Sequence, residues 1–311
     1  MSIRVAVVQK PPVLLDLEAT LARALESLDE AAAAKSHLVV FPEAYLPGYP
    51  TWIWRLRPGG DMGLSSEIHA RLRDNAVNID AGGLAPLCQA ARRHAVTVVC
   101  GMSEVDSRYS GTTLFNTVAT IGPDGTILNR HRKLMPTNPE RMVWGPGDAT
   151  GLNVVATPAG RIGTLICWES YMPLARYALF AQNIELYVAP TWDCGENWLA
   201  SMRHIAREGG CWVVSLATAI QGKDVPPSFP HRDELFKPDD WLCDGDAVIV
   251  EPSGRILAGP LHREKSILYG EIDLAKSARA RRSLDVSGHY ARPDIFRLEV
   301  KRQPMPPVDF T

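Results

Sequence analysis

Residues 164–170 read Thr-Leu-Ile-Cys-Trp-Glu-Ser, and here an apolar run leads directly into a cysteine that acidic and hydroxyl side chains follow. From Tyr171 onward the residues begin a helical pattern. We interpret the stretch as a buried strand that ends, turns sharply and starts a helix, with Ser170 as the N-cap and Pro173 in the first turn. Cys167 is then near a helix N-terminus, where unpaired N–H groups favour the nucleophilic thiolate.

Cys167 has an alternative interpretation as a small core residue, because free cysteines are among the most buried residue types. Its own stretch slightly favours that alternative, but other strands that end in reactive side chains favour a functional cysteine. Residues 37–43, His-Leu-Val-Val-Phe-Pro-Glu, predict a buried strand that ends at the carboxylate of Glu43. Residues 186–190 predict another strand, which Thr-Trp-Asp follows at 191–193.

Strands alternate with helices along the chain. A β-branched strand over residues 3–8 precedes a stretch whose leucines recur at helical spacing from 17 to 28, and strand 37–43 follows. Strand, helix, strand is the rhythm of an α/β fold. We expect further helices at 83–94, from 174 and from 198 to a stop at Gly209-Gly210, strands at 96–101, 160–166, 211–216 and 266–272, and hairpins at 114–129 and 247–258.

Three segments lack a regular pattern. Residues 44–80 are expected to be a long irregular loop, whose aromatic side chains either line a pocket or form a small core of their own. Residues 221–246 are expected to be a polar, proline-rich insertion. Residues 130–148 are dense in charge and yet hold apolar side chains, so we expect partial burial with paired charges, Lys133 with Glu140 or with Glu43.

Composition limits the classes of function. The chain has 311 residues, 46% of them hydrophobic, and its net charge of −2 (33 basic, 35 acidic) predicts no binding to nucleic acid or to an anionic membrane surface. Six scattered cysteines without a Cys-x-x-Cys pair argue against a zinc site. The N-terminus is predicted to be a first strand rather than a signal peptide, and no apolar run approaches the ~20 residues of a membrane span. We therefore expect a soluble, cytoplasmic protein in a reducing compartment.

The strand ends suggest one shared cleft, because ligands bind beyond the carboxyl ends of strands in open α/β sheets. We expect Glu43, Cys167 and, from the loop after the first hairpin, Lys133 to meet there. In such a cleft the carboxylate takes the thiol proton, the thiolate attacks an electrophilic carbon, and the ammonium stabilises the charge that develops. The indole N–H of Trp168 is a further candidate for stabilising that charge.

Three short blocks carry a resemblance to a known family: Phe41-Pro42-Glu43, Arg132-Lys133-Leu134 and Cys167-Trp168-Glu169. Together, and in this order, they resemble the signature blocks of the nitrilase superfamily of carbon–nitrogen hydrolases. The resemblance runs from Ile3 to about Phe296 and is strongest to the nitrilase branch, because residues 136–148 and 288–294 are similar to segments of that branch.

The resemblance implies a single domain over residues 1–311, folded as a four-layer α-β-β-α sandwich that assembles into dimers or longer spirals. It also implies a nitrile substrate, hydrolysed to a carboxylic acid and ammonia through a thioimidate and a thioester on Cys167, with no metal or organic cofactor. Glu43 is then the general base, Lys133 stabilises the tetrahedral intermediates, and Glu140 orients Lys133 and water. The tail from about residue 276 is expected at a subunit interface.

Aromatic residues are the candidates for shaping the substrate pocket, and they favour an aromatic or bulky aliphatic nitrile. They are Tyr49, Trp54, Trp168, Tyr171 and Trp192. Each of them has core packing as an equally open interpretation.

Rival functions remain open from the sequence. An amidase or carbamoylase would use the same three groups on an amide, whereas a non-catalytic scaffold of the same fold would merely pack them. A cysteine–histidine hydrolase would need a histidine such as His204 or His231, but no spacing in the chain selects either one.

Overall fold

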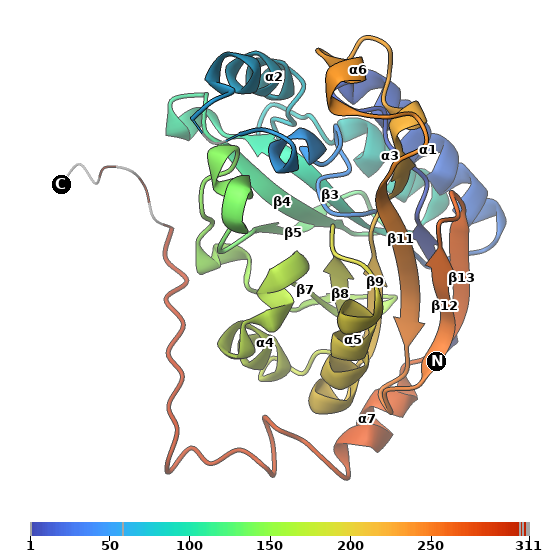
Figure 1. Ribbon diagram of the computed structural model, residues 1–311. Helices are drawn as coiled ribbons and strands as arrows, with labels where there is room; N and C mark the ends of the chain where they lie inside the picture. The colour runs from blue at the N-terminus through green and yellow to red at the C-terminus, as the bar shows by residue number, and fades with distance from the viewer. Residues whose placement is uncertain (1, 58, 305, 307, 309–311) are drawn as a thin grey trace.

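The computed structural model describes residues 2–57, 59–304, 306 and 308, and within these residues the strands form two sheets (Figure 1). The six-stranded sheet has the order β13-β1-β2-β3-β4-β5. Its strands are β1 (Ser2–Val8), β2 (Leu38–Val40), β3 (Thr97–Val105), β4 (Leu114–Ile121), β5 (Ile127–Arg132) and β13 (Ile267–Asp273). The seven-stranded sheet has the order β10-β11-β9-β8-β7-β6, with β12 paired to β11. Its strands are β6 (Val155–Thr157), β7 (Gly160–Thr164), β8 (Leu186–Pro190), β9 (Trp212–Leu216), β10 (Ala219–Gln221), β11 (Trp241–Val250) and β12 (Ile256–His262).

Helices cover the outer face of each sheet. The α-helices are α1 (Leu17–Ala33), α2 (Met62–Asp74), α3 (Ala85–His94), α4 (Pro173–Phe180), α5 (Glu196–Gly209), α6 (Arg232–Leu235) and α7 (Ala275–Arg281). The short 3₁₀ helices are η1 (Thr51–Trp54), η2 (Ser107–Tyr109), η3 (Asn138–Met142), η4 (Ala149–Gly151), η5 (Cys167–Tyr171) and η6 (Gly222–Asp224).

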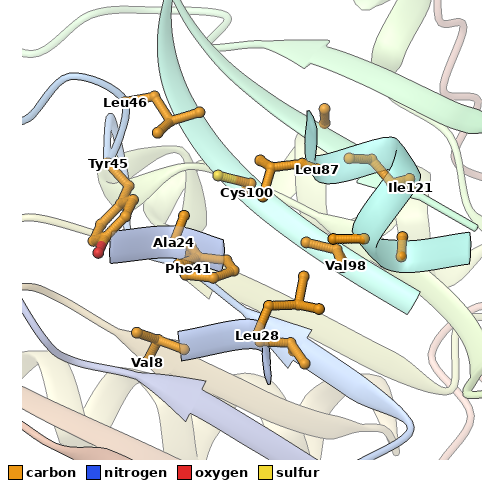
Figure 2. Close-up of a cluster of buried hydrophobic side chains, with 14 of the residues drawn as sticks. Val8, Ala24, Leu28, Phe41, Tyr45, Leu46, Leu87, Val98, Cys100 and Ile121 are labelled. Atoms are coloured by element: carbon orange, nitrogen blue, oxygen red, sulfur yellow. The ribbon is translucent and has the colours of Figure 1, made fainter. Parts of the chain in front are cut away.

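The first outer layer is formed by α1 and α3 on the six-stranded sheet. Figure 2 shows Ala24 and Leu28 of α1 and Leu87 of α3 beside Val98 of that sheet and Phe41, which directly follows β2, and all five are fully buried. Helix α1 begins at an N-cap, Asp16, whose carboxylate accepts a bond from the backbone N–H of Ala19 at 2.9 Å. The apolar stripe predicted from the leucine spacing therefore faces the sheet.

The inner layers are the two sheets, which pack face to face. Val5, Val7 and Val40 of the first sheet share a buried cluster with side chains of the second, such as Ile162 and Val214. Helices α4 and α5 cover the far face of the second sheet. Because both faces of each sheet are covered, the central strands are largely apolar rather than alternating, as in β2 and β8. The predicted four-layer α-β-β-α sandwich is confirmed.

Some predicted segments are wrong in detail. Residues 44–80 are not wholly irregular, because they contain η1 and α2, and α2 buries only Ile68 and Leu72, which left little apolar periodicity to detect. Within 221–246, α6 forms and β11 begins at Trp241, so the insertion is shorter than expected. The tail from 276 begins inside α7 and then runs along the outside of the body (Figure 1). Its last residues, 309–311, lie outside the described residues.

Membrane-spanning helices are absent from the described part of the chain, where every helix is too short or too polar to cross a bilayer.

Candidate active site

The site forms where strands of both sheets end. Strands β1, β2 and β3 are parallel, and β5 has their direction because β4 is antiparallel to both of its neighbours. Glu43 follows β2 and Lys133 follows β5, so both leave the same edge of the first sheet. Cys167 follows β7 and Thr191 follows β8, two parallel strands of the second sheet.

Cys167 is the first residue of η5, in the strained turn that follows β7. Its φ of +54° lies in the left-handed region, which residues other than glycine rarely adopt. The residue is 4% exposed, and the hydroxyl of Thr191 donates to its Sγ at 3.2 Å. The strand thus ends in a sharp turn, as predicted, and the turn presents the sulfur beside the reactive end of the neighbouring strand.

The predicted cap of the following helix is wrong. Helix α4 begins at Pro173, and its N-cap is Met172, which makes no side-chain capping bond. Ser170 instead is buried, and its oxygen accepts a hydrogen bond from the hydroxyl of Tyr187 at 2.9 Å. The Ser170 hydroxyl therefore contacts Tyr187, which is distant in sequence, and does not cap the helix as local spacing had predicted.

Glu43 depends on a close approach between two strands. A Cβ atom placed on Gly101 of β3 would lie 2.2 Å from the carbonyl oxygen of Pro42 and 2.9 Å from the Cα of Glu43. Real side chains do not tolerate such distances, so only glycine at 101 permits this path of the backbone. The absence of a side chain at Gly101 of β3 therefore allows the backbone path that positions the carboxylate of Glu43.

Lys133 joins two carboxylates in the buried interior. Its Nζ donates to Oε1 of Glu43 at 2.8 Å and to Oε2 of Glu140 at 2.7 Å, and the three residues are each 1% exposed. The predicted pairing of Lys133 is confirmed, with both proposed partners engaged at once. A buried ammonium between two carboxylates is held as the cation, because losing its proton would leave both anions uncompensated.

Glu140 is oriented by its own 3₁₀ helix and by an aromatic residue. Its Oε2 accepts the backbone N–H of Thr137 at 2.7 Å, as in a capping box. Its Oε1 accepts the hydroxyl of Tyr49 at 2.7 Å, and that hydroxyl accepts the indole N–H of Trp54 at 3.2 Å. Both oxygens of Glu140 are thus engaged, and Oε2 is the one that Lys133 contacts.

Asn116 is a site residue that the sequence reasoning missed. Its side-chain NH₂ group donates to Oε1 of Glu43 at 2.7 Å, and its backbone carbonyl oxygen accepts the backbone N–H of Lys133 at 2.8 Å. The available signal was an asparagine inside strand β4, a strand that is buried along its whole length. With Asn116 and Lys133 both on Oε1, Oε2 of Glu43 has no hydrogen-bond partner among the described residues.

Burial and mutual charge set the protonation states. Burial raises the pKa of Glu43 to about 7, although Lys133 and Asn116 oppose the rise. Burial, followed by the charge of Glu43, raises the pKa of Cys167 to about 12. For Lys133, burial lowers the pKa, but the charges of Glu43, Cys167 and Glu140 outweigh it and raise the pKa overall. The expectation that the helix N-terminus favours a resting thiolate is wrong, because desolvation in this site dominates.

The predicted pocket aromatics separate into two groups. Tyr49 and Trp192 stack with their ring centroids 4.2 Å apart, next to Glu140, and Trp54 contacts the hydroxyl of Tyr49. Trp168 and Tyr171 are 46% and 42% exposed and pack edge to face on η5, the 3₁₀ helix that begins with Cys167. The indole N–H of Trp168 donates to Oδ2 of Asp193 at 2.7 Å, so the expectation that it faces substrate charge is wrong.

Comparisons with known proteins agree over nearly the whole chain. The sequence profile of the family described as carbon-nitrogen hydrolase matches residues 4–282. The chain is similar to the aliphatic nitrilase of Sinorhizobium fredii (strain HH103), with 42% identity over 97% of this chain and 96% of that protein. It is also similar to the bifunctional nitrilase/nitrile hydratase NIT4A of Lupinus angustifolius, with 40% identity over 100% of this chain and 89% of that protein. Among solved structures, the chain shares its fold with Saccharomyces cerevisiae Nit3, a member of branch 10 of the nitrilase superfamily. The TM-score is 0.73 and the sequence identity 19%, over 93% of this chain and 96% of that chain.

Proposed function

The chain belongs to the carbon–nitrogen hydrolase family and acts as a nitrilase, and we propose that Glu43, Lys133, Cys167 and Glu140 carry out the reaction. The observation that supports these roles is the buried ammonium of Lys133, which is held between Glu43 and Glu140 and whose charge acts to lower the pKa of the Cys167 thiol. A thiol, a base and a fixed cation are the groups that covalent hydrolysis of a carbon–nitrogen bond requires.

The first step forms the carbon–sulfur bond. The free Oε2 of Glu43 takes the proton of the Cys167 thiol while Sγ attacks the nitrile carbon. One of the carbon–nitrogen π bonds breaks, and its electron pair goes to the nitrogen. Glu43 passes the proton of the thiol to that nitrogen, which gives a thioimidate and returns Glu43 to its ionised form. A base with a pKa of about 7 suits this task, because about half of it is ionised at neutral pH and the ionised form is a competent proton acceptor.

Two hydrolytic steps follow. Glu43 takes a proton from water as the water oxygen adds to the thioimidate carbon, and it passes this proton to the nitrogen. The hydroxyl proton of the tetrahedral intermediate then moves to the nitrogen as the carbon–nitrogen bond breaks, which releases ammonia and leaves a thioester on Cys167. A second water then attacks the thioester carbon, the carbon–sulfur bond breaks, and the carboxylic acid leaves while the thiol regains its proton. Lys133 stabilises the negative charge of each tetrahedral stage without reorganising, because its two carboxylate partners already hold it in place.

The substrate class is inferred from the side chains around the site. The stacked Tyr49 and Trp192 lie beside Glu140, and Trp168 and Tyr171 flank the turn that carries Cys167. These flat apolar surfaces support an aromatic or bulky aliphatic nitrile as the substrate.

The test of this function compares matched nitrile and amide substrates. Purified protein should release ammonia and acid from the nitrile faster than from the amide of the same acid, and Cys167→Ala should abolish the release with an unchanged circular dichroism spectrum. Cys88→Ala, which removes a half-buried thiol of α3, is the matched control and should keep wild-type rates. Ammonia release from nitriles by Cys167→Ala at the wild-type rate would exclude this mechanism.

The assembly is proposed to be a homodimer or larger homo-oligomer that covers α4 and the tail. Leu174 of α4 and Tyr290 and Phe296 of the tail are exposed apolar side chains, and they border one groove between α4 and the tail. An apolar face of this kind favours burial against a second copy. Light scattering on wild type and Leu174→Glu tests the proposal, with a smaller particle expected for the variant.

The number of domains is inferred from strand pairing, and the location in the cell is predicted from composition. We infer one domain, because β1 at the start of the chain pairs along its whole length with β13 near residue 270. The cytoplasmic location and the lack of nucleic-acid or membrane partners stay predictions from composition.

A further inference from the structure

Glu169 is a buried carboxylate that bonds two peptide groups at the site. Its Oε2 accepts the backbone N–H of Ile166 at 2.6 Å, and its Oε1 accepts the backbone N–H of Leu134 at 2.7 Å. Ile166 immediately precedes Cys167, and Leu134 immediately follows Lys133. One carboxylate therefore connects the backbone beside the sulfur to the backbone beside the ammonium.

The two bonded segments come from different layers of the fold. Leu134 follows β5 of the first sheet, and Ile166 follows β7 of the second. The cluster between the sheets is held by apolar contacts, which are non-directional and do not by themselves fix how one sheet slides on the other. Hydrogen bonds to a carboxylate are short and directional, so they specify the relative position of these two loops.

His131, which precedes Lys133 in the sequence, also contacts the carboxylate of Glu169. Its Nε2 lies 3.0 Å from Oε2 and 3.2 Å from Oε1 of Glu169, and both residues are 1% exposed. His131 is the second residue before Lys133 and Leu134 is the first after it, so Glu169 holds the segment on both sides of the lysine. The geometry restrains the backbone from which the ammonium extends toward Glu43 and Glu140.

We propose that Glu169 is a positioning residue of the nitrilase reaction, which aligns Lys133 on one sheet with Cys167 on the other. The inference rests on the proposed function, and it assigns Glu169 no contact with substrate. A displacement of about 1 Å between reacting groups is enough to cost on the order of 100-fold in rate.

The main test is Glu169→Gln, which keeps the shape of the side chain. A glutamine carbonyl accepts one of the two backbone N–H groups, but its NH₂ group faces the other as a second donor, so one bond is lost. We expect kcat for a nitrile to fall on the order of 100-fold with KM changed little, because the aromatic surfaces around the site are untouched. The matched control is Glu251→Gln, which removes another buried carboxylate at the β11–β12 turn, paired there with Arg255 and Lys276.

The pH profile separates positioning from simple loss of stability. The charge of Lys133 opposes the rise in the pKa of Glu43, so a displaced Lys133 lets that pKa rise further. The acidic limb of kcat/KM should therefore move to higher pH in Glu169→Gln than in wild type. Glu251→Gln should show the wild-type limb and the wild-type kcat.

The outcomes are distinct. Wild-type kcat and an unmoved acidic limb in folded Glu169→Gln would overturn the inference, whereas inactive wild-type protein would overturn the proposed function instead. If Glu169→Gln does not fold, His131→Asn provides the test, because it removes the imidazole contact and leaves both backbone bonds in place. A drop in kcat with an upward shift of the limb is expected for that variant, and wild-type values for both quantities would overturn the inference.

Discussion

The ammonium nitrogen of Lys133 lies 2.8 Å from Oε1 of Glu43 in a site where both side chains are fully buried. This ion pair leaves the second carboxylate oxygen of Glu43 without a partner among the described residues. The pair therefore divides the carboxylate into one oxygen that secures the cation and one that remains free to accept a proton. Several of the predictions below depend on this division.

Replacing Lys133 by methionine should lower kcat/KM for a nitrile by at least about 100-fold, because the cation that stabilises the tetrahedral intermediates is lost. The change also leaves two buried carboxylates unpaired, so the free energy of unfolding should fall by about 3–5 kcal/mol. Steady-state kinetics and urea unfolding measure the two effects. Lys276→Met, at a partly exposed ion pair with Glu251, should change neither rate nor stability substantially. Near-normal kinetics in Lys133→Met would contradict its assigned role.

The rate should depend on pH through Glu43. Its pKa is raised to about 7, and it accepts a proton only when ionised. The value of kcat/KM should therefore rise about tenfold per pH unit below 7 and level off above it. Initial rates between pH 5 and 9 measure this profile. A midpoint near 4.5, the ordinary value for a glutamate, would show that burial does not control the base.

Replacing Tyr49 by phenylalanine should lower kcat by about tenfold, because Glu140 loses the hydroxyl bond at 2.7 Å, which contributes on the order of 1.5 kcal/mol as a bond to a charged group. The stacked contact with Trp192 remains, so KM for an aromatic nitrile should change little. Tyr187→Phe is the control, since it removes a buried hydroxyl that contacts Ser170 outside the charged cluster. Equal kinetic effects of the two changes would argue against a specific role for Tyr49.

Replacing Glu140 by glutamine should be more severe than the Tyr49 change, because it removes one of the two anions that hold Lys133. We expect a loss of kcat on the order of 100-fold or more for the nitrile. Stopped ammonia assays with the nitrile measure it directly. Unchanged kinetics would make Glu140 a purely structural residue.

Replacing Gly101 by alanine should displace Glu43, since the added Cβ would lie 2.2 Å from the carbonyl oxygen of Pro42. Both activity and the urea midpoint should fall, as expected for overpacking in a core. Gly63→Ala in α2 is the matched control, because a Cβ there meets no atom within 4 Å and alanine favours a helix. Folded, fully active Gly101→Ala would contradict the account of how β3 places Glu43.

Much of the fold was predictable because it depends on local patterns. The buried strand before Glu43, the strand before Cys167 and the glycine stop of α5 at Gly209 all follow from apolar runs and from turn residues. Helix α2 was missed because only Ile68 and Leu72 of its residues are buried, which is too narrow an apolar face to recognise in sequence.

The site was predictable only in part. The rule that ligands bind at the carboxyl ends of strands correctly grouped Glu43 with Lys133. It gave no means of identifying Asn116 in the middle of β4, or the bonds of Glu169 to both loops. The protonation of Cys167 was also mispredicted, because the desolvation that raises its pKa comes from residues distant in sequence.

The sequence by itself determined most of the strands and helices and the reactive residues at the strand ends, because apolar periodicity and turn chemistry act over a few neighbouring residues. The four-layer arrangement was expected only from the resemblance to a known family. Only the tertiary structure decided which oxygen of Glu43 stays free, that Tyr49 serves Glu140, and that Glu169 connects the two sheets. These features depend on contacts between segments that are 35 to 91 residues apart, and such contacts exist only after the sheets have packed.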